Sequence, residues 1–174
     1  MTNMLRRFCA LPALAAALSS PAVSQATFHQ WEIKEVFTNA DGTVQFIEFF
    51  TTEPLEGGLN THNIIITSDG VAKTIVFDHS LANPTTDKHF LLATAGFGAL
   101  AGGVTPDYTP TAGNLFNPNA ASILFNFAHT QDTLTLTGSQ IPKDGVNSLT
   151  DTDLLPESGV DNMVVGVNSP TNFA

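Results

Sequence analysis

Short runs of apolar and β-branched residues, many alternating with polar residues, recur along the chain and are separated by turn-forming residues. The turns contain Asp-Gly, Asn-Pro and Gly-Gly pairs, which supply the backbone angles that tight turns require. No window after residue 26 keeps a helical period over several turns, and the best helix candidate is the short stretch 95–101. The pattern therefore predicts an all-β sandwich or barrel. The expected strands cover residues 31–37, 44–51, 63–67, 73–78, 89–94, 121–127, 133–137 and 163–167.

The first 26 residues differ from the rest and have the three parts of a secretory signal peptide. Arg6 and Arg7 give a positive start, and residues 8–18 form an apolar stretch that is too short to span a membrane. Ser24 and Ala26 place small residues where signal peptidase requires them. We therefore expect cleavage after residue 26, a secreted or periplasmic location, and no membrane insertion of the mature chain.

The chain is acidic, with 16 aspartate and glutamate residues against 6 lysine and arginine residues and a formal net charge of −10. Both arginines belong to the expected signal peptide, so cleavage brings the net charge near −12. Such a surface repels nucleic-acid phosphates, which excludes nucleic acid as a partner. The single cysteine, Cys9, is also removed, so the mature chain cannot form an internal disulfide. Its stability must come from the core, or from the core and a bound ion.

The most informative passage is a predicted hairpin of residues 31–37 and 44–50. A two-residue loop at Asp41-Gly42 sets Glu35 directly opposite Glu48, whereas a four-residue loop sets them on a diagonal and an odd-length loop separates them. Two desolvated carboxylates stay charged only where each meets donors or a cation; otherwise one takes up a proton. We therefore expect a partly buried carboxylate pair. The face that carries it comprises Ile33, Glu35, Phe37, Val44, Phe46, Glu48 and Phe50.

The hairpin sequence, Ile-x-Glu-Val-Phe at 33–37 followed by Phe-Ile-Glu-Phe-Phe at 46–50, resembles the lamin tail domain. This is an immunoglobulin-like β-sandwich found in nuclear lamins and in many exported bacterial proteins. Residues 90–94 and 105–108 also look like its bacterial members, whereas Thr51 stands where an asparagine commonly follows. The resemblance implies an immunoglobulin-like sandwich of about seven to eight strands over residues 27–138. It implies an interaction or scaffolding role and supplies no catalytic residues.

Residues 139–174 differ in composition and are expected to form an acidic loop that leads to a final edge strand. Clustered carboxylates in an exported acidic protein suit calcium, a cation that prefers oxygen ligands. The cluster lacks the glycine and the spaced terminal glutamate of an EF-hand, and an acidic run is most often a solvated loop. We expect no cofactor other than calcium. Its candidate ligands are Asp151, Asp153, Glu157 and Asp161, or alternatively the pair Glu35 and Glu48.

Three classes of function are open at this point. The first is an exported, non-enzymatic interaction or scaffolding module that binds an unknown protein or cell-surface partner. The second is a calcium-stabilised sandwich that binds carbohydrate or a surface, although a chain rich in phenylalanine uses its aromatic residues mainly to fill a core. The third is a small hydrolase that uses Glu35 and Glu48 for acid–base chemistry. We favour the first class and predict that the protein is not an enzyme.

Overall fold

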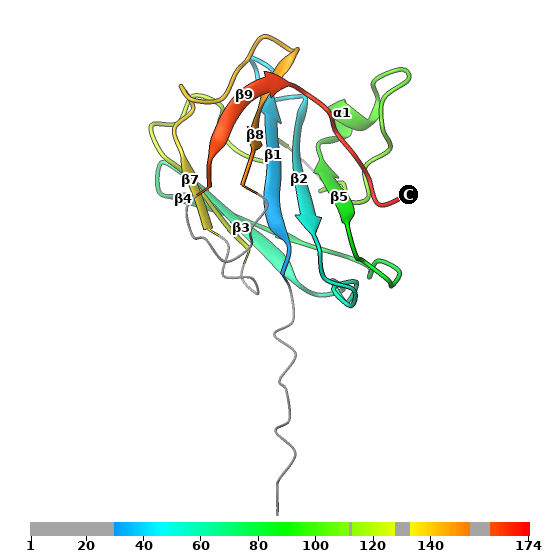
Figure 1. The fold of residues 1–174 in the computed structure, drawn as a ribbon. Coiled ribbons are helices and arrows are strands. Elements are labelled where there is room, and N and C mark those ends of the chain that lie inside the picture. The colour runs from blue at the N-terminus through cyan, green and yellow to red at the C-terminus, as the bar shows by residue number, and fades with distance from the viewer. Residues whose placement is uncertain (1–29, 112, 128–132, 154–160) are drawn as a thin grey trace, which may run out of the picture.

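The computed structural model describes residues 30–111, 113–127, 133–153 and 161–174, so the expected signal peptide lies outside the described residues. These parts contain nine strands and one short helix (Figure 1). The helix α1, Ala95–Gly98, is a single turn within the stretch expected to be helical. The described residues therefore confirm the all-β prediction. The strands are Glu32–Thr38 (β1), Gln45–Thr51 (β2), Asn63–Ser68 (β3), Val71–Val76 (β4), Lys88–Ala93 (β5), Ile123–Phe127 (β6), Thr133–Leu136 (β7), Asn147–Asp151 (β8) and Met163–Val167 (β9).

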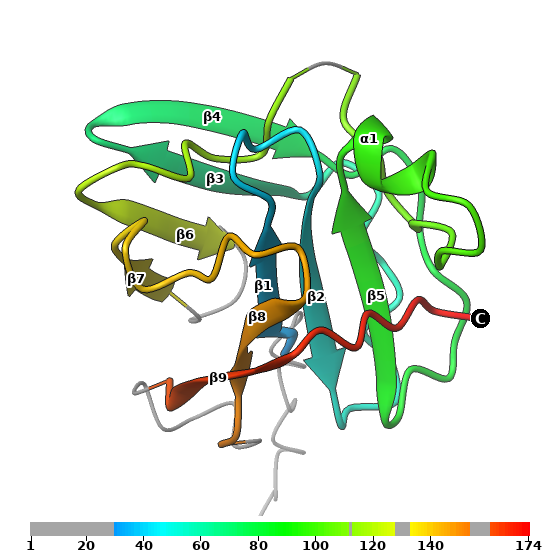
Figure 2. The same ribbon diagram turned by 90° about the horizontal axis from the view of Figure 1, so that it is seen from above.

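The strands form two antiparallel sheets that pack face to face as a β-sandwich (Figure 2). One sheet has five strands in the order β5-β2-β1-β8-β9, and the other has four in the order β4-β3-β6-β7. The first sheet is therefore one strand wider than the second, and β9 is one of its edges. No described helix is long and apolar enough to cross a membrane.

Aromatic side chains fill the core between the sheets. Phe49 and Phe90 of the five-stranded sheet stack with ring centroids 4.4 Å apart, and Phe127 of the opposite sheet meets Phe49 edge-on at 5.6 Å. Trp31, immediately before β1, packs edge-on against Phe90 and is 1% exposed. Its indole Nε1 donates to the Glu56 carbonyl at 2.9 Å, so burial leaves its polar atom satisfied.

The first hairpin has the register that a turn centred on Asp41 and Gly42 requires, with Glu35 opposite Glu48. A bulge at Lys34 changes this register towards the start of β1. The expectation that Ile33 shares the face of Glu35 is therefore wrong. The extra residue turns Ile33 to the other face, where it joins the sandwich core.

The last part of the chain supplies two strands to the five-stranded sheet. Met163–Val167 forms the expected edge strand, β9. The expected acidic loop, however, also contains β8, which lies between β1 and β9. Its sequence, Asn-Ser-Leu-Thr-Asp, has one large apolar residue, Leu149. On the opposite face of the strand, the Ser148 hydroxyl donates a hydrogen bond to Glu35. This low hydrophobicity is why the sequence pattern did not indicate a strand.

Candidate functional site

Glu35 and Glu48 lie side by side on the outer face of the five-stranded sheet, the face turned away from the sandwich core. Glu35 comes from β1 and Glu48 from β2, and they are cross-strand partners. They are nevertheless only 1% and 2% exposed. A second apolar cluster, which includes Phe37 and Phe46, covers one end of this face. Two adjacent carboxylates are thus buried where a sandwich usually presents solvent-exposed side chains.

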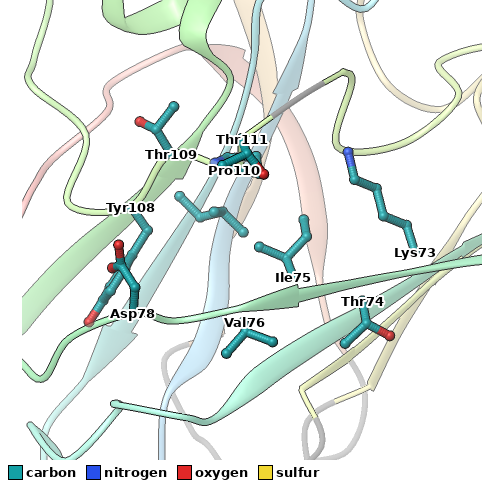
Figure 3. A pocket seen from close by; sticks show the side chains of 10 residues that line it. Lys73, Thr74, Ile75, Val76, Asp78, Tyr108, Thr109, Pro110 and Thr111 are labelled. Atoms are coloured by element: carbon teal, nitrogen blue, oxygen red, sulfur yellow. The ribbon is translucent and has the colours of Figure 1, made fainter.

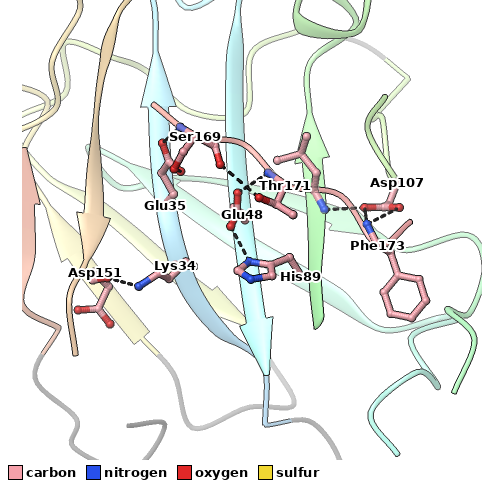
Figure 4. A network of polar contacts seen from close by, with 10 residues as sticks. Lys34, Glu35, Glu48, His89, Asp107, Asp151, Ser169, Thr171 and Phe173 are labelled. Atoms are coloured by element: carbon pink, nitrogen blue, oxygen red, sulfur yellow. Dashed lines mark hydrogen bonds and ion pairs between the residues drawn. The ribbon is translucent and has the colours of Figure 1, made fainter. Parts of the chain in front are cut away.

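A C-terminal strap, residues 168–174, covers the pair. It crosses over β1, β2 and β5 and ends beside β5 (Figures 2 and 4). Every second residue of the strap donates its backbone N–H to a carboxylate of the domain. The pairs are Ser169 with Glu35 at 3.0 Å, Thr171 with Glu48 at 2.7 Å, and Phe173 with Asp107 at 3.1 Å.

Further donors satisfy the remaining oxygens of the pair. The Ser148 hydroxyl donates to Glu35 Oε1 at 2.6 Å, and the Ser169 hydroxyl donates to Glu35 Oε2 at 3.2 Å. Glu48 Oε1 lies 2.6 Å from His89 Nδ1. Of the outcomes expected for a desolvated pair, the structure therefore has hydrogen-bond donors around both carboxylates.

Burial sets the electrostatics of this face. Desolvation raises the pKa of Glu35, and the neighbouring charge of Glu48 raises it further, while hydrogen bonds from Ser148 and Ser169 act in the opposite direction. Desolvation likewise raises the pKa of Asp107 against the hydrogen bonds it accepts from the backbone of Leu91 and Phe173. Both groups therefore bind protons more tightly in the folded protein than in an exposed chain.

The surroundings of Glu35 and Glu48 favour a structural role over acid–base catalysis. Each accepts one backbone N–H from the strap, so a substrate could reach them only after the strap had moved. Their donors come from β8, from β5 and from the chain end, none of which the sequence analysis assigned to this site. The seven residues of the strap have no apolar–polar alternation that would indicate a strand, so the sequence did not show that Ser169, Thr171 and Phe173 contact the domain.

The calcium candidates do not form a common site in the described residues. Asp151 is 2% exposed, and its Oδ1 accepts the backbone N–H groups of Asp153 and Asn162 at 3.0 Å each. Asp161 is half-buried, and Glu157 lies outside the described residues. No group of three or more histidine, cysteine or acidic side chains in the described parts is arranged to hold a metal ion.

A shallow cleft of about 390 Å³ lies beside β4 on the flank of the sandwich (Figure 3). Residues 108–111 line the cleft together with the apolar side chains of Ile75 and Leu92. Lys73 reaches over the rim and donates to the Asn114 carbonyl at 2.6 Å, and burial lowers its pKa. The Lys73 ammonium group thus holds the loop at Asn114 against β4. The cleft has the size of a small-molecule site but lacks a converging set of polar groups among its described lining residues.

The free edge of β9 has the opposite character to the covered carboxylates. Val164, Val165 and Val167 are 41%, 62% and 71% exposed. Val165 is the cross-strand partner of Leu149, which is only 4% exposed. The facing sheet is one strand narrower. Met163 at the start of β9 still packs against the core, whereas Val165 and Val167 further along the same face are open to solvent.

The other three sheet edges in the described parts of the chain are protected. The edge of β5 is covered by residues 107–108, which exchange backbone hydrogen bonds with Leu91 and Ala93. The edge of β4 carries Lys73, which is tied to Asn114. The strand β7 is only four residues long, and threonine and leucine alternate along it. Short length, lysine and covering loops are the usual means of preventing edge pairing. The five-residue β9 carries no lysine, and no described strand pairs with its free edge.

Comparisons with protein-family models, with curated proteins and with solved structures found no match.

Proposed function

We propose that this protein is an exported, non-enzymatic interaction module, an immunoglobulin-like sandwich of the lamin-tail type, that binds a partner through the free edge of β9. One observation carries the proposal: β9 presents apolar side chains on a strand edge with which no described strand pairs. An extended segment of a partner can add to such an edge, with backbone hydrogen bonds giving affinity and side-chain contacts giving specificity. The signal-peptide pattern of residues 1–26 supports the exported location.

The covered carboxylates support a non-enzymatic role. A hydrolase needs an acid and a base that can reach its substrate. Here Glu35 and Glu48 are buried, and the strap and neighbouring side chains occupy their oxygens. The calcium-stabilised alternative predicts that thermal melting shifts upward with calcium and downward with chelator. The interaction module predicts the same melting temperature in both.

Site-specific photo-cross-linking tests the proposed docking edge. A photoreactive residue is placed at Val165 and, as a matched control, at Val71 of β4, which is 73% exposed on another sheet edge. In cells that export the protein, we expect position 165 to give an adduct with one defined polypeptide. Adding Val167→Lys should abolish that adduct, because it introduces a desolvated charge next to the contact.

The control decides what the adduct means. Equal yields of the same adduct from positions 165 and 71 would show random collision and contradict the proposal. No adduct from position 165 would contradict it as well. A partner identified by mass spectrometry must also bind the purified protein, and must bind the Val167→Lys variant more weakly.

A further inference from the structure

We infer that the partner of the β9 edge is a second copy of this chain, paired antiparallel about a two-fold axis at Val165. The inference rests on the proposed function and names its partner. In this arrangement the two five-stranded sheets join through β9 into one continuous sheet. An interface of this kind is isologous, so the same strand must be complementary to itself.

The sequence of β9 is complementary to itself in this register. Residues 162–168 read Asn-Met-Val-Val-Gly-Val-Asn and contain no charge. Pairing about Val165 sets Met163 opposite Val167 on the inner face and Gly166 opposite Val164 on the outer face. The two asparagines, Asn162 and Asn168, then meet at the ends. Apolar residues face apolar residues, a small residue faces a branched one, and polar residues close each end.

Neighbouring registers are poorer. A centre at Gly166 brings Asn162 opposite Pro170, which has no N–H to donate. A centre at Val164 brings Asp161 opposite Val167, which sets a charge against an apolar side chain. The centre at Val165 is thus the one that uses the whole uncharged run and ends before both the proline and the aspartate.

The backbone of β9 is oriented for this pairing. At the two ends of the β8–β9 ladder, Thr152 N–H donates to the Asn162 carbonyl and Asn168 N–H donates to the Val146 carbonyl. The even-numbered residues therefore bond to β8. In an antiparallel ladder the hydrogen-bonded residues alternate, so the N–H and C=O groups of Met163, Val165 and Val167 point to the free edge. A partner strand centred on Val165 meets all of them with reciprocal bonds.

Charge and area set the expected strength. Five paired residues on each side form an interface near the lower end of the known range, so the dimer should be weak and concentration-dependent. The two acidic copies also repel each other at long range, while the interface itself contains no ion pair. Added salt screens the repulsion and should therefore strengthen the dimer, the reverse of its effect on an interface held by salt bridges.

Cysteine cross-linking in the purified protein tests both the partner and the register. In a Cys9→Ser background, Val165→Cys places two thiols opposite each other across the two-fold axis, at a Cα separation of about 5.5 Å that a disulfide can bridge. Val167→Cys faces Met163 of the other copy and so should not link to itself. Val71→Cys, on the β4 edge, is the control for random collision.

We expect covalent dimers from Val165→Cys in yields several-fold higher than from Val167→Cys or Val71→Cys. Sedimentation of the wild type should show a dimer that increases with protein concentration and with salt, and Val165→Lys should be monomeric. Cross-linking that is strongest at position 167 or 71, or a dimer that survives Val165→Lys, overturns the inference. A monomeric wild type overturns it too, yet leaves the proposed function standing if photo-cross-linking at position 165 captures a different polypeptide.

Discussion

The strap that covers the outer face of β1 and β2 begins where β9 ends, yet this covered face and the free edge of β9 differ in which side chains they expose to water. The first carries charged residues, Glu35 and Glu48, and seals them from water. The second carries valines and leaves them exposed. Each reverses the usual distribution, in which carboxylates are exposed and aliphatic side chains are buried.

The two reversals have different physical consequences. Hydrogen-bond donors offset part of the cost of burying a carboxylate, and those of Glu35 and Glu48 come from other parts of the same chain. The carboxylates therefore hold the strap in place. Exposed valines on a free strand edge have no such compensation among the described residues, so another molecule would be needed to bury them. A pair of acidic side chains would by itself suggest that Glu35 and Glu48 form the functional site. The hydrogen bonds of that pair are made within the chain, however, whereas the exposed valines and edge backbone groups of β9 favour β9 as the binding surface.

The largest effect is expected from removing the strap. A chain that stops after Asn168 loses the N–H groups that Ser169, Thr171 and Phe173 donate to carboxylates. Hydrogen bonds to charged groups contribute about 1.5–3 kcal/mol each, and water will replace part of this, so we expect a loss on the order of 3 kcal/mol. Urea unfolding measures the change. Deletion of Ala174 alone keeps these bonds and should leave stability unchanged; an equal loss from both deletions would contradict a structural role for the strap.

The next effect concerns the shape and the charge of Glu35. Glu35→Ala leaves the buried Ser148 hydroxyl and Ser169 N–H without their acceptor, which should cost about 1–3 kcal/mol. Glu35→Gln keeps an acceptor oxygen and removes the repulsion from Glu48, so its effect should lie within about 1 kcal/mol. Equilibrium unfolding at neutral pH compares them. If glutamine costs as much as alanine, the negative charge itself is required and our description of the pair is wrong.

The pH dependence of stability should distinguish the same two side chains. Because burial raises the pKa of Glu35 above 4.5, the stability linked to its protonation is fully present below pH 4.5 and is lost as the pH rises through the folded value. The stability of wild type relative to Glu35→Gln should therefore fall from acidic to neutral pH. Asp107, whose pKa is also raised, is present in both proteins and cancels from the difference. A difference that does not change with pH would show that Glu35 is not desolvated.

The sequence predicts the elements whose pattern is local. The alternation of apolar and polar residues indicated most of the strands, and the Asp41-Gly42 turn indicated the register that pairs Glu35 with Glu48. The short α1 lies within the stretch 95–101, the best helix candidate. The bulge at Lys34 has no local signal, because it depends on how β1 meets its neighbours. Ser148, Ser169 and Thr171 lie more than 100 positions away from the carboxylates that they contact, and β8 is polar on the face that meets Glu35. Hydrogen bonds between residues this far apart in the chain leave no periodic pattern in the sequence, so they could not be predicted from it.

The smallest effect on the stability of the monomer is expected from a substitution in β9. Leu149 and Val165 are cross-strand partners on one face, but Leu149 is 4% exposed and Val165 is 62% exposed. Leu149→Ala removes a core side chain and should cost about 2–5 kcal/mol. Val165→Ala, measured at a concentration where the protein is monomeric, should change stability by less than about 0.5 kcal/mol, since it touches little within the chain. At higher concentration the same substitution should lower the apparent stability further, because a dimer that forms only from folded chains adds to stability by mass action. A large loss for Val165→Ala in the monomer would mean that the valine stabilises the fold itself, and the exposed edge would then need no partner to explain it.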